Sequence, residues 1–349
     1  MSGEDLLVWL EGRVGRLRLN RPEALNALTH EMTLAMEKAL IAWRTDSNID
    51  AIVVCATGDR AFCAGGDIQA LYKSGLKSPE SGREFWRDEY RLNAMIASYP
   101  KPYIALMNGI TMGGGVGVSA HGSHRIVTEN TMLAMPEASI GFIPDVGGTY
   151  LLSRSPGQSG LYLGMSGARM NAADAIFAGF ADTYVPSNAL PGLVVALADG
   201  TSPDEAISLV EETAPDGELA ALQDKINDVF AVPEILGCVR RLDKLAAGGD
   251  EWARKTFSML RNNSPLSVAT TFTAVHKARE LATLEDCLAL EYNFAHRALT
   301  GHEFLEGIRA LVIDKDKKPN WQPATLEEVS PEMVENVLAP LGEKTWNAA

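Results

Sequence analysis

Residues 111–150 read TMGGGVGVSAHGSHRIVTENTMLAMPEASIGFIPDVGGTY. The glycine triplet at 113–115 follows an apolar run and allows the backbone to turn sharply from a strand into a helix. Backbone N–H groups at such a turn can donate to an oxyanion. Glu137 and Asp145 follow in a mostly apolar setting, where two carboxylates could share acid–base or nucleophilic work. The combination indicates an enzyme that acts on an activated carbonyl.

Short apolar runs alternate with helical patterns on either side of this stretch. Thr29 is a plausible N-cap for an amphipathic helix that carries Met32, Met36 and Leu40. Residues 108–112 are expected to form a loop, and helices are expected after the glycine triplet and after 147–148. The expected strands are residues 6–10, 14–19, 51–55, 103–107, 125–128 and 132–135. Repetition of strand, loop and helix predicts an α/β core.

The composition changes after about Pro186, where the strand signal fades. Ser202, followed by proline and two acidic residues, is typical of a helix start. Residues 314–323 are typical of a loop, and a last helix is expected from Pro331. We therefore expect an α/β core with the active site in residues 1–190 and a helical region in residues 191–349.

Composition limits the classes of function. The chain has 349 residues, with 31 basic and 45 acidic side chains and a formal net charge of −14. A field of this sign repels nucleic acid and anionic membrane surfaces, so neither is expected as a partner. An anionic ligand such as coenzyme A would need a local basic patch.

The cysteines indicate a reducing compartment. Cys55, Cys63, Cys238 and Cys287 are scattered, without a Cys-x-x-Cys pair or a cluster beside histidine. This pattern predicts neither a structural zinc site nor a disulfide framework. The N-terminal residues show no signal peptide, transit peptide or membrane-spanning run. The expected location is the cytoplasm, and no metal site is expected.

A second glycine pair stands beside the triplet at 113–115. Gly65 and Gly66 also follow an apolar run and precede a helix. One N–H group from each loop would make an oxyanion hole, in which each donor contributes roughly 3–4 kcal/mol. The alternative is that these glycines only allow tight turns and close helix packing.

Three other motifs in the same region have competing interpretations. Residues 115–120 (GVGVSA) approach a dinucleotide fingerprint, with Glu129 after the next strand. Residues 117–121 (GVSAH) resemble a nucleophile elbow but lack its closing glycine. His121 and His124 could ligate a metal, yet no third ligand is evident. Each of these signals is weaker than the oxyanion interpretation.

The two carboxylates also have a simpler interpretation. Taken singly, Glu137 or Asp145 could be a solvated loop acid or a helix cap.

Combined motifs resemble the crotonase (enoyl-CoA hydratase/isomerase) superfamily. The matching segments are residues 20–28 (NRPEALNAL), 61–68 (AFCAGGDI), 108–115 (NGITMGGG) and 136–137 (PE). The resemblance implies an α/β fold, a crotonase-like spiral of repeated β-β-α units with a helical C-terminal region. It also implies a coenzyme A thioester as substrate, with the N–H groups of Gly66 and Gly114 as its oxyanion hole.

Within the superfamily the chain is most similar to the 3-hydroxyisobutyryl-CoA hydrolases of valine breakdown. The similarity extends through residues 263–267 (NSPLS), 291–292 (EY) and 304–310 (FLEGIRA), beyond the length of short hydratases. It implies Glu137 and Asp145 as catalytic carboxylates and Glu89 as a substrate contact, with Gly114, Glu137 and Asp145 also lining the substrate. Coenzyme A is then part of the substrate and no separate cofactor is expected.

One departure from the hydratases favours hydrolysis. Hydratases with two catalytic glutamates place the first one two positions after the glycine triplet, and Gly117 stands there. Asp145 stands where hydratases commonly have glycine.

Arg21 and Arg60, beside the first motifs, are candidate contacts for coenzyme A phosphates, unless they form surface salt bridges. The alternatives are a hydratase or isomerase on the same scaffold and a non-catalytic CoA-binding protein. A homo-oligomer remains open.

Overall fold

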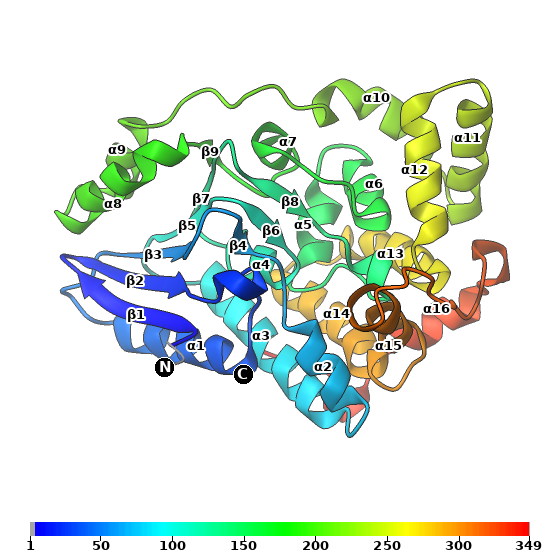
Figure 1. Ribbon diagram of the computed structural model, residues 1–349, viewed down its shortest axis with the longest axis horizontal. Helices are drawn as coiled ribbons and strands as arrows, with labels where there is room; N and C mark the ends of the chain where they lie inside the picture. The colour runs from blue at the N-terminus through cyan, green and yellow to red at the C-terminus, as the bar shows by residue number, and fades with distance from the viewer. Residues whose placement is uncertain (1–3, 349) are drawn as a thin grey trace. The chain divides into compact units, whose positions relative to one another are not determined.

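The computed structural model describes residues 4–348. The chain forms two compact units, each assembled from separate segments of the sequence (Figure 1). The first unit comprises Met1–Asp67, Asp88–Leu133 and Met170–Glu218. The second unit comprises Ile68–Arg87, Ala134–Arg169 and Leu219–Ala349. Both units therefore draw on residues from the first half of the chain.

A parallel sheet with one antiparallel edge forms the centre of the first unit. Its six strands lie in the order β1-β2-β3-β5-β7-β9, and a small sheet has the order β4-β6-β8. The strands are β1 (Leu6–Glu11), β2 (Val14–Leu19), β3 (Ala51–Ala56), β4 (Ala61–Cys63), β5 (Tyr103–Met107), β6 (Ile110–Met112), β7 (His124–Val127), β8 (Met132–Ala134) and β9 (Thr183–Tyr184). Only β1 and β2 pair antiparallel in the large sheet, as a hairpin with Leu6 opposite Leu19.

Most strands coincide with the predicted ones, and one prediction is wrong. Residues 108–112 were expected to form a loop, but Ile110–Met112 is strand β6. It pairs in parallel with β4, so that Ala61 lies opposite Ile110. A three-residue strand is too short for its alternation to show in the sequence, and its pairing partner is distant along the chain.

Helices cover both faces of the large sheet in the first unit. The helices of this unit include α1 (His30–Trp43), α7 (Ala172–Phe177), α8 (Leu190–Ala198) and α9 (Pro203–Ser208), and the short α4 (Gly114–Gly117) contacts β4 and β6 of the small sheet. Helix α1 begins at the predicted cap, because the Thr29 side chain accepts a hydrogen bond from the Met32 N–H. Gly15 contacts the Trp43 ring of α1 on one face of the sheet. Val14 packs on the other face in an apolar cluster with Leu193 and Val194 of α8.

The second unit is built from helices, in agreement with the helical patterns of the C-terminal sequence. They are α2 (Ile68–Gly75), α5 (Gly148–Arg154), α6 (Ser159–Ser166), α10 (Leu219–Phe230), α11 (Ile235–Ala247), α12 (Glu251–Asn262), α13 (Pro265–Ala278), α14 (Leu284–Ala298), α15 (Glu303–Ile308) and α16 (Pro331–Leu338). Helix α13 packs against α5, α6 and α16, and most of its residues are buried. Helix α3 (Glu80–Ala97) contributes residues through Arg87 to this unit and its later residues to the first.

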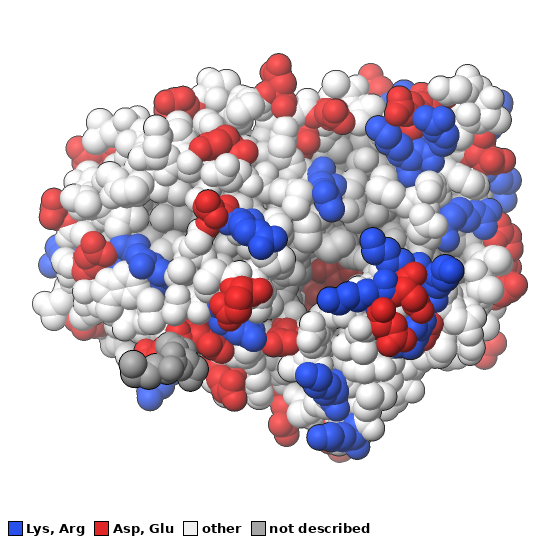
Figure 2. Space-filling model, in the orientation of Figure 1, with Lys and Arg blue, Asp and Glu red and all other residues white. Residues whose placement is uncertain are grey.

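Described elements after β9 are helical, as the fading strand signal predicts. The compact units nevertheless interleave segments from both sides of residue 190. None of the helices within residues 4–348 combines the length and apolar character needed to cross a membrane. Around α15, charged side chains of both signs gather on the surface (Figure 2), and Arg309 there pairs with Glu306, Asp314 and Asp316.

Candidate active site

The turn after β2 is fixed by a buried asparagine. Leu25 and Asn26 both adopt the left-handed conformation, with φ of 52° and 56°. The Asn26 side chain donates to the carbonyls of Thr57 and Ala61 and accepts from the Arg21 N–H at 2.8 Å. Asparagine tolerates this conformation better than most residues and can bond the backbone locally. The NRPEALNAL motif therefore ties the turn to strand β4.

This turn positions Gly66. Leu28 donates its N–H to the Gly65 carbonyl, and Asp67 donates to the Leu28 carbonyl, both at 2.8 Å. Gly66 lies between Gly65 and Asp67 in the sequence, and its own N–H group donates to neither of these two hydrogen bonds. Gly65 has φ of 120°, a conformation that strongly favours glycine. The local backbone thus leaves the Gly66 N–H available to another acceptor.

The glycine triplet positions a second donor. Gly113 is the N-cap of α4, with φ of 49° and ψ of −120°, and Gly114 is the first residue of that short helix. The N–H of a first helical residue has no acceptor within its own helix. A Cβ at Gly115 would lie 2.2 Å from the Cys63 carbonyl oxygen, so the chain approaches β4 more closely than a larger residue allows.

Three of the predicted site residues meet in the first unit. A Cβ added at Gly114 would lie 3.3 Å from the Gly66 nitrogen and 2.6 Å from Oε1 of Glu89. Glu89 is only 2% exposed. Burial raises the pKa of the nearby Cys63 thiol to about 12, and the negative charge of Glu89 adds to this effect. The structure therefore brings the backbone N–H groups of Gly66 and Gly114 close to the buried carboxylate of Glu89.

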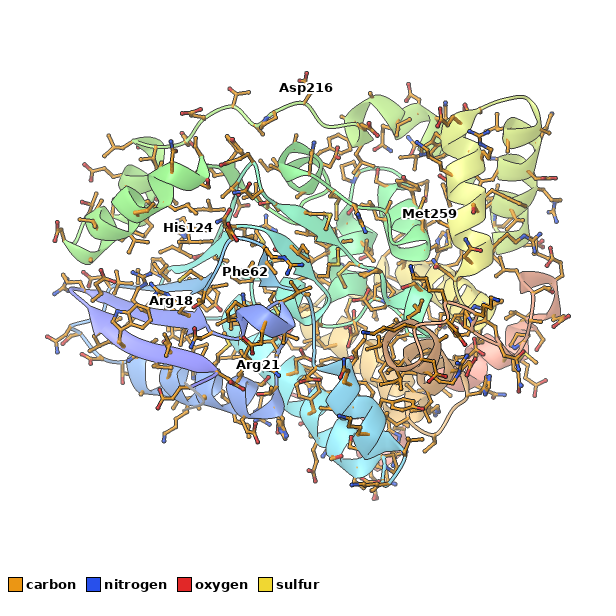
Figure 3. All side chains as sticks on the ribbon, in the orientation of Figure 1. Arg18, Arg21, Phe62, His124, Asp216 and Met259 are labelled. Carbon is orange, nitrogen blue, oxygen red and sulfur yellow. The ribbon has the colours of Figure 1, made fainter. Side chains whose placement is uncertain are left out.

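Arg21 and Arg60 have different surroundings. Arg21, labelled in Figure 3, pairs with Asp67 at 3.1 Å and with Asp5 at 3.4 Å, and donates to the Ala27 carbonyl at 2.7 Å. Its guanidinium therefore supports the turn beside Gly66, in keeping with the salt-bridge alternative. Among the ion pairs formed within residues 4–348, none involves Arg60. Its contact with a phosphate stays a prediction.

Glu137 lies in the second unit, at the start of a short 3₁₀ turn, η2 (Glu137–Ile140). Its side chain is 6% exposed. The turn ends at Gly141, where φ is 74°, and the Phe142 N–H donates to the Glu137 carbonyl at 3.0 Å. Glu137 is thus a buried carboxylate on a closed turn rather than a solvated loop acid.

The C-terminal NSPLS motif supports this turn. Ser264 donates its N–H to the Ala138 carbonyl at 2.9 Å. Its hydroxyl accepts from the Ser267 N–H as the N-cap of α13 and donates to Oε2 of Glu303. Burial raises the pKa of Glu303, and the bond from Ser264 opposes that rise. One serine thereby connects the Glu137 turn to α13 and α15.

Two glycines let α15 approach the same turn at backbone distance. A Cβ at Gly141 would lie 2.2 Å from the Glu303 carbonyl oxygen, and a Cβ at Gly307 would lie 2.3 Å from the Ile140 carbonyl oxygen. Both positions exclude a larger side chain unless the backbone moves. The FLEGIRA motif is therefore a packing element that holds the Glu137 turn.

Asp145 lies on a second strained turn of this unit. It is 5% exposed. The following residues, Val146 and Gly147, have φ of 53° and 80°, and a β-branched residue at positive φ is an outlier. The N-cap of α5 is Gly147, without a side-chain cap, and the Gly148 N–H donates to the main-chain carbonyl of Asp145 at 2.7 Å. The Asp145 carboxylate is therefore not the N-cap of α5.

Glu291 of α14 holds the turn in this conformation. Its Oε2 accepts from the Gly147 N–H at 2.8 Å, and its Oε1 accepts from the Thr149 N–H at 2.8 Å and from the Thr149 hydroxyl at 2.5 Å. Burial raises the pKa of Glu291 to about 8; the bond from Thr149 opposes the rise, and the charge of Asp145 adds to it. The two carboxylates are therefore electrostatically coupled.

Three residues that hold the Glu137 and Asp145 turns in place were not identified as functional from the sequence. Ser264 and Glu291 stand within the matching segments 263–267 and 291–292, and Glu303 directly precedes the segment 304–310. Their partners are far away along the chain, as Glu291 and Gly147 illustrate with a separation of 144 residues. An acidic residue on the buried face of a helix was the one available signal, because carboxylates are rarely buried without a partner.

Several residues of the competing motifs have other partners in the structure. Ser119 is fully buried and its hydroxyl donates to the Gly115 carbonyl at 2.6 Å, so it is not an exposed nucleophile. Glu129 accepts from the Ser187 N–H, and His124, which is labelled in Figure 3, contacts Asp204 at 3.1 Å. Within residues 4–348, no group of three His, Cys, Asp or Glu side chains is arranged to hold a metal ion.

Comparison with known sequences identifies the relatives of this chain. Residues 14–338 match the family model described as enoyl-CoA hydratase/isomerase. The mitochondrial 3-hydroxyisobutyryl-CoA hydrolase of Gallus gallus is 40% identical, over 98% of this chain and 90% of that protein. The human protein of the same name is 36% identical, again over 98% of this chain and 90% of that protein.

Two solved structures share the whole fold. An enoyl-CoA hydratase from Rhodobacter sphaeroides is 45% identical with a TM-score of 0.93, covering 99% of this chain and 100% of that one. A carnitinyl-CoA dehydratase from Mycobacterium thermoresistibile is 43% identical with a TM-score of 0.93, covering 97% of each chain. The similarity to the crotonase fold inferred from the sequence is confirmed. The chain belongs to the enoyl-CoA hydratase/isomerase family.

Proposed function

We propose that this protein hydrolyses the thioester of 3-hydroxyisobutyryl-CoA to 3-hydroxyisobutyrate and free coenzyme A. Relatives of that name align with it over nearly their full length, at 36–40% identity. The observation that carries the choice of reaction is Gly117, a buried glycine in α4 where two-glutamate hydratases have their first acid. Without that carboxylate the chain lacks half of the hydration machinery.

The N–H groups of Gly66 and Gly114 would act as the oxyanion hole. Their support is the closeness of the two backbones, since a Cβ at Gly114 would lie 3.3 Å from the Gly66 nitrogen. Donors fixed before the reaction need no reorganisation as charge develops on the carbonyl oxygen. Each would contribute roughly 3–4 kcal/mol to stabilisation of the transition state.

Glu137 would either attack the thioester carbon itself or activate the water that attacks it. As a nucleophile, its carboxylate oxygen would bond to the thioester carbon, the carbon–sulfur bond would break, and the thiolate would leave with the electron pair. Water would then hydrolyse the resulting anhydride and release the acid and Glu137. As a general base, it would instead remove a proton from the attacking water. A thiol has a pKa of about 8.5, so the leaving group needs little acid assistance.

Asp145 and Glu89 would position the substrate and move protons. Asp145 would orient the 3-hydroxyl group or handle the proton of water or thiol, and the Glu291 carboxylate would hold its turn. Glu89 would contact the substrate near Gly114. Arg21 and Arg60 remain proposed contacts for coenzyme A phosphates, and Arg21 could serve only by exchanging its pairs with Asp67 and Asp5.

A hydratase is the second candidate, because the two solved structures described above carry hydratase or dehydratase names. Syn addition of water needs two acids, so Glu89 would have to replace the acid missing at Gly117. The deciding experiment supplies wild type separately with 3-hydroxyisobutyryl-CoA and with methacrylyl-CoA. Release of free thiol from the first identifies a hydrolase. Loss of enoyl absorbance from the second, without thiol release, identifies a hydratase and overturns the proposal.

The wider context is also a proposal. The product would belong to valine breakdown, as the resemblance of the sequence to the 3-hydroxyisobutyryl-CoA hydrolases implies. Those vertebrate relatives are named mitochondrial, whereas we propose the cytoplasm for this chain. Fractionation of its native cells with an antibody to the protein tests this location, and recovery in an organelle or membrane fraction would contradict it.

A further inference from the structure

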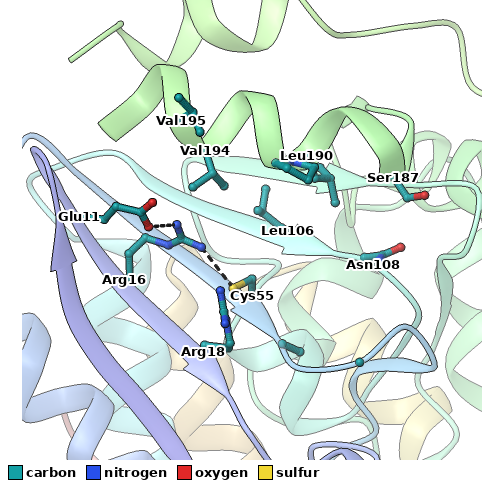
Figure 4. A pocket seen from close by; sticks show the side chains of 13 residues that line it. Glu11, Arg16, Arg18, Cys55, Leu106, Asn108, Ser187, Leu190, Val194 and Val195 are labelled. Atoms are coloured by element: carbon teal, nitrogen blue, oxygen red, sulfur yellow. Dashed lines mark hydrogen bonds and ion pairs between the residues drawn. The ribbon is translucent and has the colours of Figure 1, made fainter. Parts of the chain in front are cut away.

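The first unit contains a cavity of about 430 Å³ that involves none of the proposed catalytic residues. Strands β2 and β3 form its floor and α8 lies over it (Figure 4). Its size falls within the range typical of small-molecule sites. Gly66, Gly114 and Glu89 do not line it, and all of its lining residues belong to the first unit. Ligand binding in this cavity would not require the proposed hydrolase activity.

The cavity arises where the apolar packing on this face of the sheet stops. Val14 is buried in the apolar cluster beneath α8. Side chains two positions apart on a strand share a face, so Arg16 and Arg18 continue along β2 from Val14. Two guanidinium groups therefore occupy positions where a covered sheet would carry aliphatic side chains.

Arg16 is held rigidly although it is charged. The residue is 4% exposed, its Nη1 donates to Glu11 at 2.5 Å, and its Nη2 lies 3.6 Å from Sγ of Cys55 (Figure 4). Its Nε is buried and has no hydrogen-bond acceptor among the described residues. Native proteins pair nearly all such buried donors. Arg16 is thus a preorganised cation with one donor unused.

Arg18 adds a second charge that the described residues leave without a carboxylate at ion-pair distance. Its guanidinium stacks 4.9 Å from the centre of the Trp9 ring, and Arg16 lies 5.1 Å from the same ring. This stacking fixes the side chains without neutralising them. Glu11 balances one of the two guanidinium groups, so the cavity retains about one positive charge.

The rest of the lining is largely aliphatic. It includes Leu106 of β5 and Leu190, Pro191 and Val194 of α8, and Asn108 adds an amide at its edge; Figure 4 labels each of these residues except Pro191. A ligand that fits this lining carries one negative group for the arginines and a short apolar body for the aliphatic residues. We propose that the cavity is a binding site for a small aliphatic monocarboxylate, held by Arg18 and Arg16 and packed against α8.

Cys55 provides a reporter for this site. It lines the cavity and is partly exposed, whereas Cys63, Cys238 and Cys287 are buried. Burial raises the pKa of each of these three thiols to about 12, which keeps them unreactive. Alkylation by the neutral reagent N-ethylmaleimide, followed by mass spectrometry, will therefore report occupancy of the cavity.

The probe is 4-methylpentanoate, and its isosteric control is 4-methylpentanamide. At about ten times its dissociation constant, the carboxylate is expected to slow alkylation of Cys55 about tenfold. The uncharged amide should leave the rate unchanged. Arg18→Gln should abolish the protection, while Arg254→Gln, an exposed arginine of α12, should retain it.

Calorimetric titration provides a second readout that does not depend on thiol chemistry. Wild type is titrated with each of the two compounds, and Arg18→Gln and Arg254→Gln are titrated with 4-methylpentanoate. Equal alkylation rates with and without 4-methylpentanoate in wild type, together with no heat of binding, would overturn the proposal. Equal protection by the amide, or protection that survives in Arg18→Gln, would show that the arginines do not select the ligand and would overturn it as well.

Discussion

Glu291 and Thr149 are joined by two hydrogen bonds, from the Thr149 N–H at 2.8 Å and from its hydroxyl at 2.5 Å, both to Oε1 of the glutamate. The other oxygen accepts from the Gly147 N–H. A buried carboxylate of α14 thereby fixes the turn that carries Asp145. Helix α14 therefore does more than pack in the second unit, because it fixes the backbone that carries one of the candidate site residues.

We predict that Glu291→Gln changes how stability depends on pH. The pKa of Glu291 is raised from 4.5 to about 8 in the folded protein, so between those values the folded state binds more protons than the unfolded state. Its contribution to stability is complete below the unfolded pKa and is lost as pH rises, by at most about 1.4 kcal/mol per pH unit. Tm measured from pH 5 to 8 should fall less steeply in the variant.

The same variant should also lose activity. The glutamine amide presents an N–H₂ group to one of the two backbone donors, which leaves that donor unsatisfied at a cost of about 1–3 kcal/mol. We expect kcat to fall about tenfold or more through displacement of the Asp145 turn. Glu280→Gln, at an exposed position after α13, is the matched control. An unchanged kcat in Glu291→Gln would contradict the positioning role.

Gly114→Ala tests the proposed oxyanion hole. The new Cβ would lie 2.6 Å from Oε1 of Glu89, so either the N–H donor or the carboxylate must shift. Loss of one such donor typically reduces kcat about 10²–10³-fold, and we expect a loss of that order with little change in Tm. The control is Gly192→Ala in α8, where a Cβ meets nothing within 4 Å. Equal kinetics for the two variants would exclude Gly114 from the reaction.

Ser264→Ala separates the support of Glu137 from ordinary helix capping. Loss of an N-cap costs about 0.5–2 kcal/mol, and this serine additionally bonds Glu303 and donates its N–H to the Ala138 carbonyl. We expect a lower Tm together with a several-fold lower kcat. Ser330→Ala removes a comparable cap from α16 and should lower Tm alone. A fall in kcat of equal size in both variants would show a general loss of stability.

The fold was predictable where the signal is local. Strand β3 is a continuous apolar run and α1 has a threonine cap, so both follow from short-range patterns. Strand β6 was missed because three residues carry too little alternation. The helix expected at the glycine triplet exists as α4 but is a single turn, because four of the five residues 113–117 are glycines with low helix propensity.

The candidate site was predictable only in part. The glycines and Glu137 stand in short motifs, and the structure places Gly66, Gly114 and Glu89 together in the first unit. Glu291 acts on residues 144 and 142 positions away, which no local pattern reveals. The interleaving of the compact units has the same cause, because contacts between distant segments depend on the complete fold.

Release of free coenzyme A from 3-hydroxyisobutyryl-CoA, measured for wild type, Glu137→Gln and Asp145→Asn, tests the central claim most directly. Both substitutions preserve the size of the side chain, so both variants are expected to fold. Their Tm values verify this. We predict thiol release by wild type and a loss of about 10³-fold or more in Glu137→Gln, because the attacking oxygen or base is removed, with a clear loss also in Asp145→Asn. Undiminished release in a folded Glu137→Gln, or no release by folded wild type, would contradict the account.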